Sequence, residues 1–150
     1  MKLEGMGTVL ANLNRAIAGI EGRTKKGMIK AALLVKGEAI RETPRDTGNL
    51  ANSAYTQFSW AGAFEGGAPK FVGKNAGKLT EGYGSGRAAA HAEVAGADLV
   101  ATIGYTAFYA PFVHEINKNY RQGNWQFLRN ALAKNEMKIL GIIKEEARIK

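Results

Sequence analysis

Apolar residues recur every three or four positions between residues 8 and 20, which is the spacing of one face of an amphipathic helix. They are Val9, Leu10, Leu13, Ala16, Ile17 and Ile20. Gly22 predicts a stop, and Thr24 can cap a second helix with a similar apolar stripe. Pro44 ends that helix, because the residue before a proline is pushed out of the helical region. The pattern therefore predicts two helices before residue 44.

After Pro44, apolar residues recur every two positions instead of every three or four. Alternation over residues 54–60 predicts a strand with Phe58 and Trp60 on one face. Residues 61–87 are crowded with glycine and predict a long loop, in which a short strand is suggested only around residues 71–72.

The second half of the chain combines strand and helix signals. Residues 90–94 and 99–105 flank a turn and predict a β-hairpin. Residues 109–116 predict a short helix, followed by the polar loop 117–123. A helical pattern then starts at Asn124, which can cap it, and continues to the end of the sequence. The apolar side of this last helix is formed by Leu128, Leu132, Ile139 and Ile143.

These elements predict an α+β fold in one domain, residues 1–150. Two N-terminal helices and a C-terminal helix would pack on a small antiparallel β-sheet, and residues 61–87 would form an extended glycine-rich loop. The strand with Phe58 and Trp60 would expose apolar surface in a monomer, which predicts a partner on that side.

Composition and charge narrow the range of functions. The chain has 21 lysine and arginine residues against 13 aspartate and glutamate residues, a net charge of +8. This balance favours nucleic acid, an anionic surface or an acidic protein as a partner. Cysteine is absent, which excludes disulfides, zinc–thiolate sites and thiol nucleophiles and suits a reducing cytoplasm. Polar residues interrupt residues 1–20, so we expect neither a signal peptide nor association with a membrane.

Three stretches are specific enough to indicate a family. Residues 43–50 read Thr-Pro-Arg-Asp-Thr-Gly-Asn-Leu, and Ser53 follows. Residues 105–115 read Tyr-x-x-Phe-Tyr-Ala-Pro-Phe-Val-x-Glu, and residues 126–132 read Gln-Phe-Leu-Arg-Asn-Ala-Leu. In order and spacing these stretches resemble the small head-to-tail joining proteins of long-tailed bacteriophages, which are called neck, tail-completion or minor tail proteins. The resemblance covers nearly the whole chain.

Two positions depart from the pattern of that family. Asn117 stands where the family usually has glycine, and Gln126 stands where it has the proline of a Pro-Phe-Leu step. The loop at residues 61–87 is also longer and richer in glycine than usual. These departures leave the expected fold unchanged and concern the local geometry of the loops, including residues 117–123.

The resemblance implies a structural virion protein of the neck or tail, assembled in the cytoplasm of the bacterial host. It implies a homo-oligomeric ring of six or twelve subunits that joins the head connector to the tail. The expected neighbours are a head-completion or adaptor protein and a tail terminator or tube protein, with non-specific contact to genomic DNA in the channel. On this interpretation the chain is not an enzyme, and it has no catalytic, cofactor-binding or metal-binding residues.

The residue types in these stretches suit a scaffold. In the turn, Pro44 fixes φ, Asp46 or Thr47 can accept hydrogen bonds from nearby backbone N–H groups, and Gly48 permits a positive φ before Leu50. We therefore expect a sharp reversal of the chain into the first strand.

The later stretches supply the expected packing and interface residues, which are Tyr109, Pro111, Phe112, Glu115, Phe127 and Leu128. Tyr109 and Phe112 lie three positions apart, so both should point at the sheet, with Pro111 in the first helical turn. Phe127 and Leu128 should anchor the last helix. Glu115 is interpreted as an ion-pair partner for a basic residue of a neighbouring subunit, or as a plain solvated carboxylate.

Two groups of residues invite an enzymatic interpretation. His114 precedes Glu115, but adjacent helical residues point in different directions and no histidine cluster accompanies them, so a structural or surface role is favoured. The Gly-Tyr-Gly-Ser-Gly-Arg run at residues 82–87 lacks the strand, the following helix and the lysine of a phosphate-binding loop. It predicts a flexible arm that orders against a neighbouring ring, or plain disorder.

Basic and aromatic residues leave a second class of function open. Lys26, Lys30 and Arg41 fall along one side of the second predicted helix and could face DNA, an acidic neighbour or only solvent. Trp60 and Trp125 are interpreted as core or interface residues and not as stacking platforms for nucleic acid. The alternative to the virion protein is therefore a small basic protein that binds nucleic acid without sequence specificity.

Overall fold

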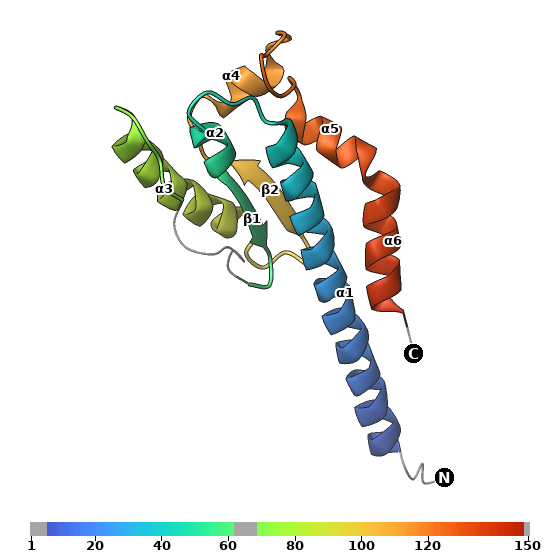
Figure 1. Cartoon of the computed structure of the whole chain (residues 1–150). Coiled ribbons are helices and arrows are strands. Elements are labelled where there is room, and N and C mark those ends of the chain that lie inside the picture. The colour runs from blue at the N-terminus through green and yellow to red at the C-terminus, as the bar shows by residue number, and fades with distance from the viewer. Residues whose placement is uncertain (1–5, 62–68, 149–150) are drawn as a thin grey trace. The chain divides into compact units, whose positions relative to one another are not determined.

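The computed structural model describes residues 6–61 and 69–148 and has a mixed helical and sheet architecture, so the α+β class is confirmed (Figure 1). The chain divides into two compact units. Residues 32–136 form the unit that contains the sheet, named here the sheet unit. Residues 1–31 and 137–150 form the second, named here the helical unit.

The N-terminal region forms one continuous helix, α1 (Met6–Glu42), so the prediction of two helices is wrong. A glycine inside a helix costs only about 1 kcal/mol relative to alanine, and Gly22 is flanked by residues that favour helix. Thr24 does not cap a second helix, because its hydroxyl donates a hydrogen bond of 2.9 Å to the carbonyl of Ile20 one turn earlier. The helix ends just before Pro44, as predicted.

The sheet has two antiparallel strands, β1 (Ala54–Phe58) and β2 (Ala101–Tyr105), with Ala54 opposite Tyr105. The strand predicted at residues 54–60 is thus confirmed over its first five residues. The second arm of the predicted hairpin, residues 99–105, is confirmed as a strand over residues 101–105. The hairpin itself is wrong, because residues 90–94 end a helix, α3 (Ala76–Val94), which packs on β1. Phe58 is 0% exposed in a single chain, so the predicted open apolar face is wrong at that residue.

Residues 76–87 of the glycine-rich segment are helical, so the prediction of a long loop is wrong from Ala76 onward. A Cβ added at Gly86 would lie 3.0 Å from the Thr106 side chain, so glycine here allows α3 to pack closely against the chain that follows β2. The high glycine content of the segment predicted a flexible loop, whereas Gly86 permits close packing of a helix. The part of the predicted loop at residues 62–68 lies outside the described residues.

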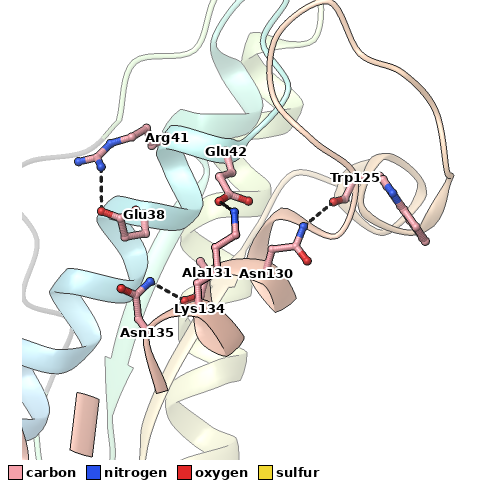
Figure 2. Close-up of polar contacts among 8 residues, drawn as sticks. All are labelled: Glu38, Arg41, Glu42, Trp125, Asn130, Ala131, Lys134 and Asn135. Carbon is pink, nitrogen blue, oxygen red and sulfur yellow. Dashed lines mark hydrogen bonds and ion pairs between the residues drawn. The ribbon is translucent and has the colours of Figure 1, made fainter. Parts of the chain in front are cut away.

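The last third of the chain contains three helices. The short helix predicted at residues 109–116 is confirmed as α4 (Ala110–Glu115), with proline in its first turn. The predicted final helix is instead divided into α5 (Phe127–Lys134) and α6 (Glu136–Ala147). The side-chain amide of Asn135, at the break, donates a hydrogen bond of 2.7 Å to the carbonyl of Ala131 (Figure 2).

Asn124 was predicted to cap the last helix, but the residue at the cap position of α5 is Gln126. The backbone N–H of Asn124 instead donates a hydrogen bond of 2.8 Å to the carbonyl of Glu42. Gln126 precedes α5 with φ 53. The proline ring holds φ near −65° and cannot adopt this conformation. The departure from the family pattern at this position therefore coincides with a backbone geometry that proline would forbid.

The core of the sheet unit is centred on Phe127, which is 1% exposed. Its ring makes edge contacts with Tyr105 and His114, each at a centroid distance of 5.0 Å. The buried apolar cluster around it contains Leu50, Leu79, Ala107 and Ala110. Since Phe127 is the first residue of α5, the start of this helix is anchored in the core, as predicted. Lys134, the last residue of α5, pairs with Glu42 at the end of α1, with a nitrogen–oxygen distance of 2.5 Å (Figure 2).

In the helical unit, α6 packs on α1 at Gly27. A Cβ added at Gly27 would lie 3.0 Å from the backbone of Ile143, so a side chain there would force the two helices apart. Within the described residues, no helix is long and apolar enough to span a membrane.

Candidate functional site

The sequence stretches that carry the family resemblance meet around α4 in the sheet unit. Residues 44–50 line a hollow of about 250 Å³ together with Tyr109, Val113 and residues 120–122. This hollow is named here the turn hollow. It contains all five predicted turn residues, which are Pro44, Asp46, Thr47, Gly48 and Leu50.

The turn has the predicted backbone chemistry. Gly48 adopts φ 85, and the Thr47 hydroxyl accepts a long hydrogen bond of 3.4 Å from the N–H of Asn49. The chain does not pass directly into the first strand, because one helical turn, α2 (Asn49–Asn52), intervenes. The Asn49 side chain donates to the carbonyl of Val72 at 2.8 Å and accepts from the N–H of Val72 at 2.9 Å. Residues 71–72, where a short strand was suggested, form no strand, and Val72 is held by these two bonds instead.

The opposite wall of the turn hollow is the loop at residues 117–123. The Tyr120 hydroxyl donates a hydrogen bond of 3.0 Å to the carbonyl of Val113 in α4. Gly123 adopts φ 89 and packs closely against the backbone of Thr43 and Pro44. This polar loop is therefore held against α4 and the end of α1 by specific contacts.

A second hollow of about 270 Å³ lies on another side of α4 and is named here the His114 hollow. Four of the six predicted packing and interface residues line it, namely Pro111, Glu115, Phe127 and Leu128. Tyr105, Ala110 and His114 complete the lining. Of the remaining two, Tyr109 lines the turn hollow and packs against the core.

The predicted orientation of Phe112 is wrong, because its side chain is 67% exposed. Ala110 is the α4 residue that faces the core, and successive helical residues turn by about 100°, so Phe112 points away from it. Ile116 and Phe108 are also exposed, at 53% and 47%. These three exposed apolar residues, spaced four positions apart along the chain, are named here the α4 ridge. Tyr109 precedes the helix as its N-cap and packs against the core, so the spacing of three positions did not place it on the same side as Phe112.

His114 and Glu115 were expected to point in different directions, but His114 Nδ1 lies 2.7 Å from Glu115 Oε1. Arg129 lies 3.9 Å from the same carboxylate within one chain. Glu115 thus has two basic neighbours before any second subunit is considered. Within residues 6–61 and 69–148, no three His, Cys, Asp or Glu side chains are grouped so that they could hold a metal ion.

The predicted basic face is bordered by carboxylates. Lys30 forms an ion pair with Glu146 of α6, and Lys26 lies 3.9 Å from the same side chain. In the sheet unit, Arg41 pairs with Glu38 at 2.8 Å (Figure 2). Each of the three predicted contact residues therefore has an acidic neighbour, which lowers the local positive potential.

Burial raises the pKa of Tyr105 from 10.0 to about 12, partly offset by the hydrogen bond with Thr43, whose hydroxyl oxygen lies 2.7 Å away. An unfolded chain releases this proton near pH 10, whereas the folded chain keeps it until about pH 12. The stabilisation is therefore complete below pH 10 and is lost as the pH rises towards 12. Unfolding free energies measured across this range should fall more steeply for the natural chain than for Tyr105→Phe. Parallel curves would contradict the assignment.

Several residues of the site were missed by sequence reasoning. Asn49 and Gly123 contact distant parts of the chain, and Tyr120 bonds to Val113 in the preceding helix. Only glycine carried a local signal, as a residue that tolerates positive φ. Comparison with known proteins adds no assignment, since no protein family, curated protein or solved structure matches this chain.

Proposed function

We propose that the chain is a structural subunit of the head–tail interface of a long-tailed bacteriophage and assembles into a ring that joins the head connector to the tail. The support is the order and spacing of the three stretches, together with their position around α4. Residues that are far apart in the sequence line two neighbouring hollows of the sheet unit. Such a concentration suits a surface that contacts other subunits better than a solvated surface.

The observation that carries the proposal is the α4 ridge, where Phe112, Ile116 and Phe108 are all about half exposed or more. Aromatic and large apolar residues are enriched at the centres of protein interfaces. The ridge and the hollows beside it lie on different sides of α4, so one subunit can offer the ridge while another receives it. A contact between two different surfaces of like subunits closes into a ring when its rotation fits.

The neighbours in this proposal are a head-completion or adaptor protein on one side and a tail terminator or tube protein on the other. Cryo-electron microscopy of particles should then place the chain between the connector and the tail tube. Its absence from particles would count against the proposal.

The alternative of a basic nucleic-acid-binding protein has weaker support, because Lys26, Lys30 and Arg41 lie beside carboxylates. A gel-shift titration across ionic strength separates the two proposals. A nucleic-acid-binding protein should show strong retention of DNA that falls steeply with salt. A ring subunit should show only weak retention.

Replacing Phe112 with aspartate should disrupt assembly while leaving the fold intact. A buried aromatic residue at an interface contributes about 2 kcal/mol or more, which corresponds to roughly a 30-fold weaker association. Because Phe112 is 67% exposed in a single chain, circular dichroism and the melting temperature of the subunit should change little. Light scattering coupled to gel filtration measures the assembly.

Met137→Asp is the matched control, because Met137 is 81% exposed and lies outside the α4 ridge. We expect it to assemble like the natural chain. Normal assembly of Phe112→Asp would contradict the role of the ridge.

A further inference from the structure

The turn hollow combines an apolar lining with two guanidinium groups. Arg45 comes from the turn, and Arg121 comes from the loop on the opposite wall. Both arginines are exposed. Among the described residues, neither arginine lies within ion-pair distance of a carboxylate.

Three other basic residues of the sheet unit have carboxylate neighbours. Arg41 pairs with Glu38 and Lys134 pairs with Glu42, both visible in Figure 2, and Arg129 lies 3.9 Å from Glu115. The two arginines of the turn hollow leave a positive charge next to an apolar recess. Guanidinium groups bind carboxylates through paired hydrogen bonds, so this recess is suited to an acidic ligand.

We propose that the turn hollow binds an acidic segment of a partner protein. Carboxylates of that segment pair with Arg45 and Arg121, and an adjacent apolar side chain packs against Tyr109 and Val113. The inference rests on the proposed function in one respect, which is that the partner is a neighbouring virion protein.

The size and lining of the hollow favour a peptide over nucleic acid. Its volume of about 250 Å³ is below the range typical of sites that enclose a whole small molecule, roughly 300–1,000 Å³. It suits one or two side chains of a segment that crosses the surface. Asp46 also lines the hollow, so two arginines and one carboxylate leave the lining a net charge of +1, which suits one or two carboxylates better than a row of phosphates. The half-buried Tyr109 and Val113 offer apolar contact that a phosphate backbone cannot use.

The walls of the hollow are fixed before any ligand binds. The turn is tied to Val72 by both polar atoms of the Asn49 side chain, and the loop is tied to Val113 by the Tyr120 hydroxyl. The N–H of Asn124 fastens the end of the same loop to Glu42. A preformed site loses little conformational entropy on binding, so even a short peptide can bind measurably.

The test uses the full chain and a fluorescently labelled peptide, Gly-Glu-Leu-Asp-Phe-Glu-Gly, read by fluorescence anisotropy. A neutral version carries glutamine and asparagine in place of the acidic residues. We expect the acidic peptide to bind and the neutral peptide to bind at least about tenfold more weakly. The double variant Arg45→Gln/Arg121→Gln should weaken binding of the acidic peptide by about tenfold.

The double variant Lys144→Gln/Arg148→Gln is the matched control, because both residues are exposed, both lie outside the turn hollow and the variant loses the same two charges. It should leave the affinity within about twofold of the natural value. Equal binding of both peptides, or undiminished binding by the double variant, would overturn the inference. Displacement of the peptide by a short DNA duplex or by inorganic phosphate at an equal concentration would also overturn it, in favour of a general anion site.

Assembly is measured in the same samples, so the two proposals can fail separately. Normal ring assembly without peptide binding overturns only the acidic-segment inference. Binding of the peptide by a chain that stays monomeric supports the site and contradicts the ring.

Discussion

Replacing Phe127 with alanine should lower the free energy of unfolding by about 3–5 kcal/mol. The side chain is 1% exposed, and its ring packs edge-on against Tyr105 and His114. Truncation therefore removes a large buried apolar surface and leaves a cavity between α5 and the end of β2. Urea denaturation followed by far-ultraviolet circular dichroism measures the loss. The concentration should be low enough that only subunits are present, because assembly adds to apparent stability.

Phe112→Ala is the control for this effect, since it deletes the same atoms from a side chain that is 67% exposed. Exposed positions of this kind change stability by less than about 0.5 kcal/mol. Similar losses for Phe112→Ala and Phe127→Ala would mean that the core is not centred on α5.

Replacing Gly123 with alanine should lower the free energy of unfolding by about 2–5 kcal/mol. Its φ of 89 costs a residue with a side chain about 1–2 kcal/mol. In addition, the new Cβ would lie 2.5 Å from the nitrogen of Pro44 and 2.6 Å from the carbonyl carbon of Thr43. Backbone atoms cannot rotate away, and overpacking of this kind costs about 1–3 kcal/mol. Hydrogen exchange at the N–H of Asn124, which is bonded to Glu42, reports whether the loop detaches.

Gly96→Ala separates the two contributions. Gly96 has a similar φ of 77, but a Cβ added there would have nothing within 4 Å. This variant should lose only the conformational part, about 1–2 kcal/mol. If Gly96→Ala and Gly123→Ala were equally destabilised, the close approach of the loop to Thr43 and Pro44 would be ruled out.

The elements that the sequence predicted well are those with strong local signals. Pro44 marks the end of α1, the alternation at residues 54–58 marks β1, and the proline of α4 marks its first turn. Each of these signals acts within a few residues, so no knowledge of distant contacts was needed.

The errors occur where neighbouring residues or tertiary packing override a local signal. Gly22 suggested a break that the rest of α1 overrides. The glycines of residues 82–87 suggested a loop, whereas Gly86 lets α3 approach Thr106. The hairpin was lost for the same reason, because residues 90–94 continue α3 instead of pairing with β2.

The sequence predicted many of the residues of the candidate site but not where they lie in the fold. The turn residues and most of the later motif residues do line the two hollows beside α4. The loop wall with Tyr120 and Arg121 was not foreseen, because it lies opposite the turn at residues 44–50, far away in the sequence. The exposure of Phe112 depends on which side of a six-residue helix meets the core, and periodicity does not determine that.

The most direct test of the central proposal is native mass spectrometry of the purified full chain over a series of concentrations. The proposal predicts a discrete closed oligomer of six or twelve subunits that grows at the expense of the monomer, without a continuous ladder of intermediate sizes. A chain that stays monomeric at every concentration would contradict it.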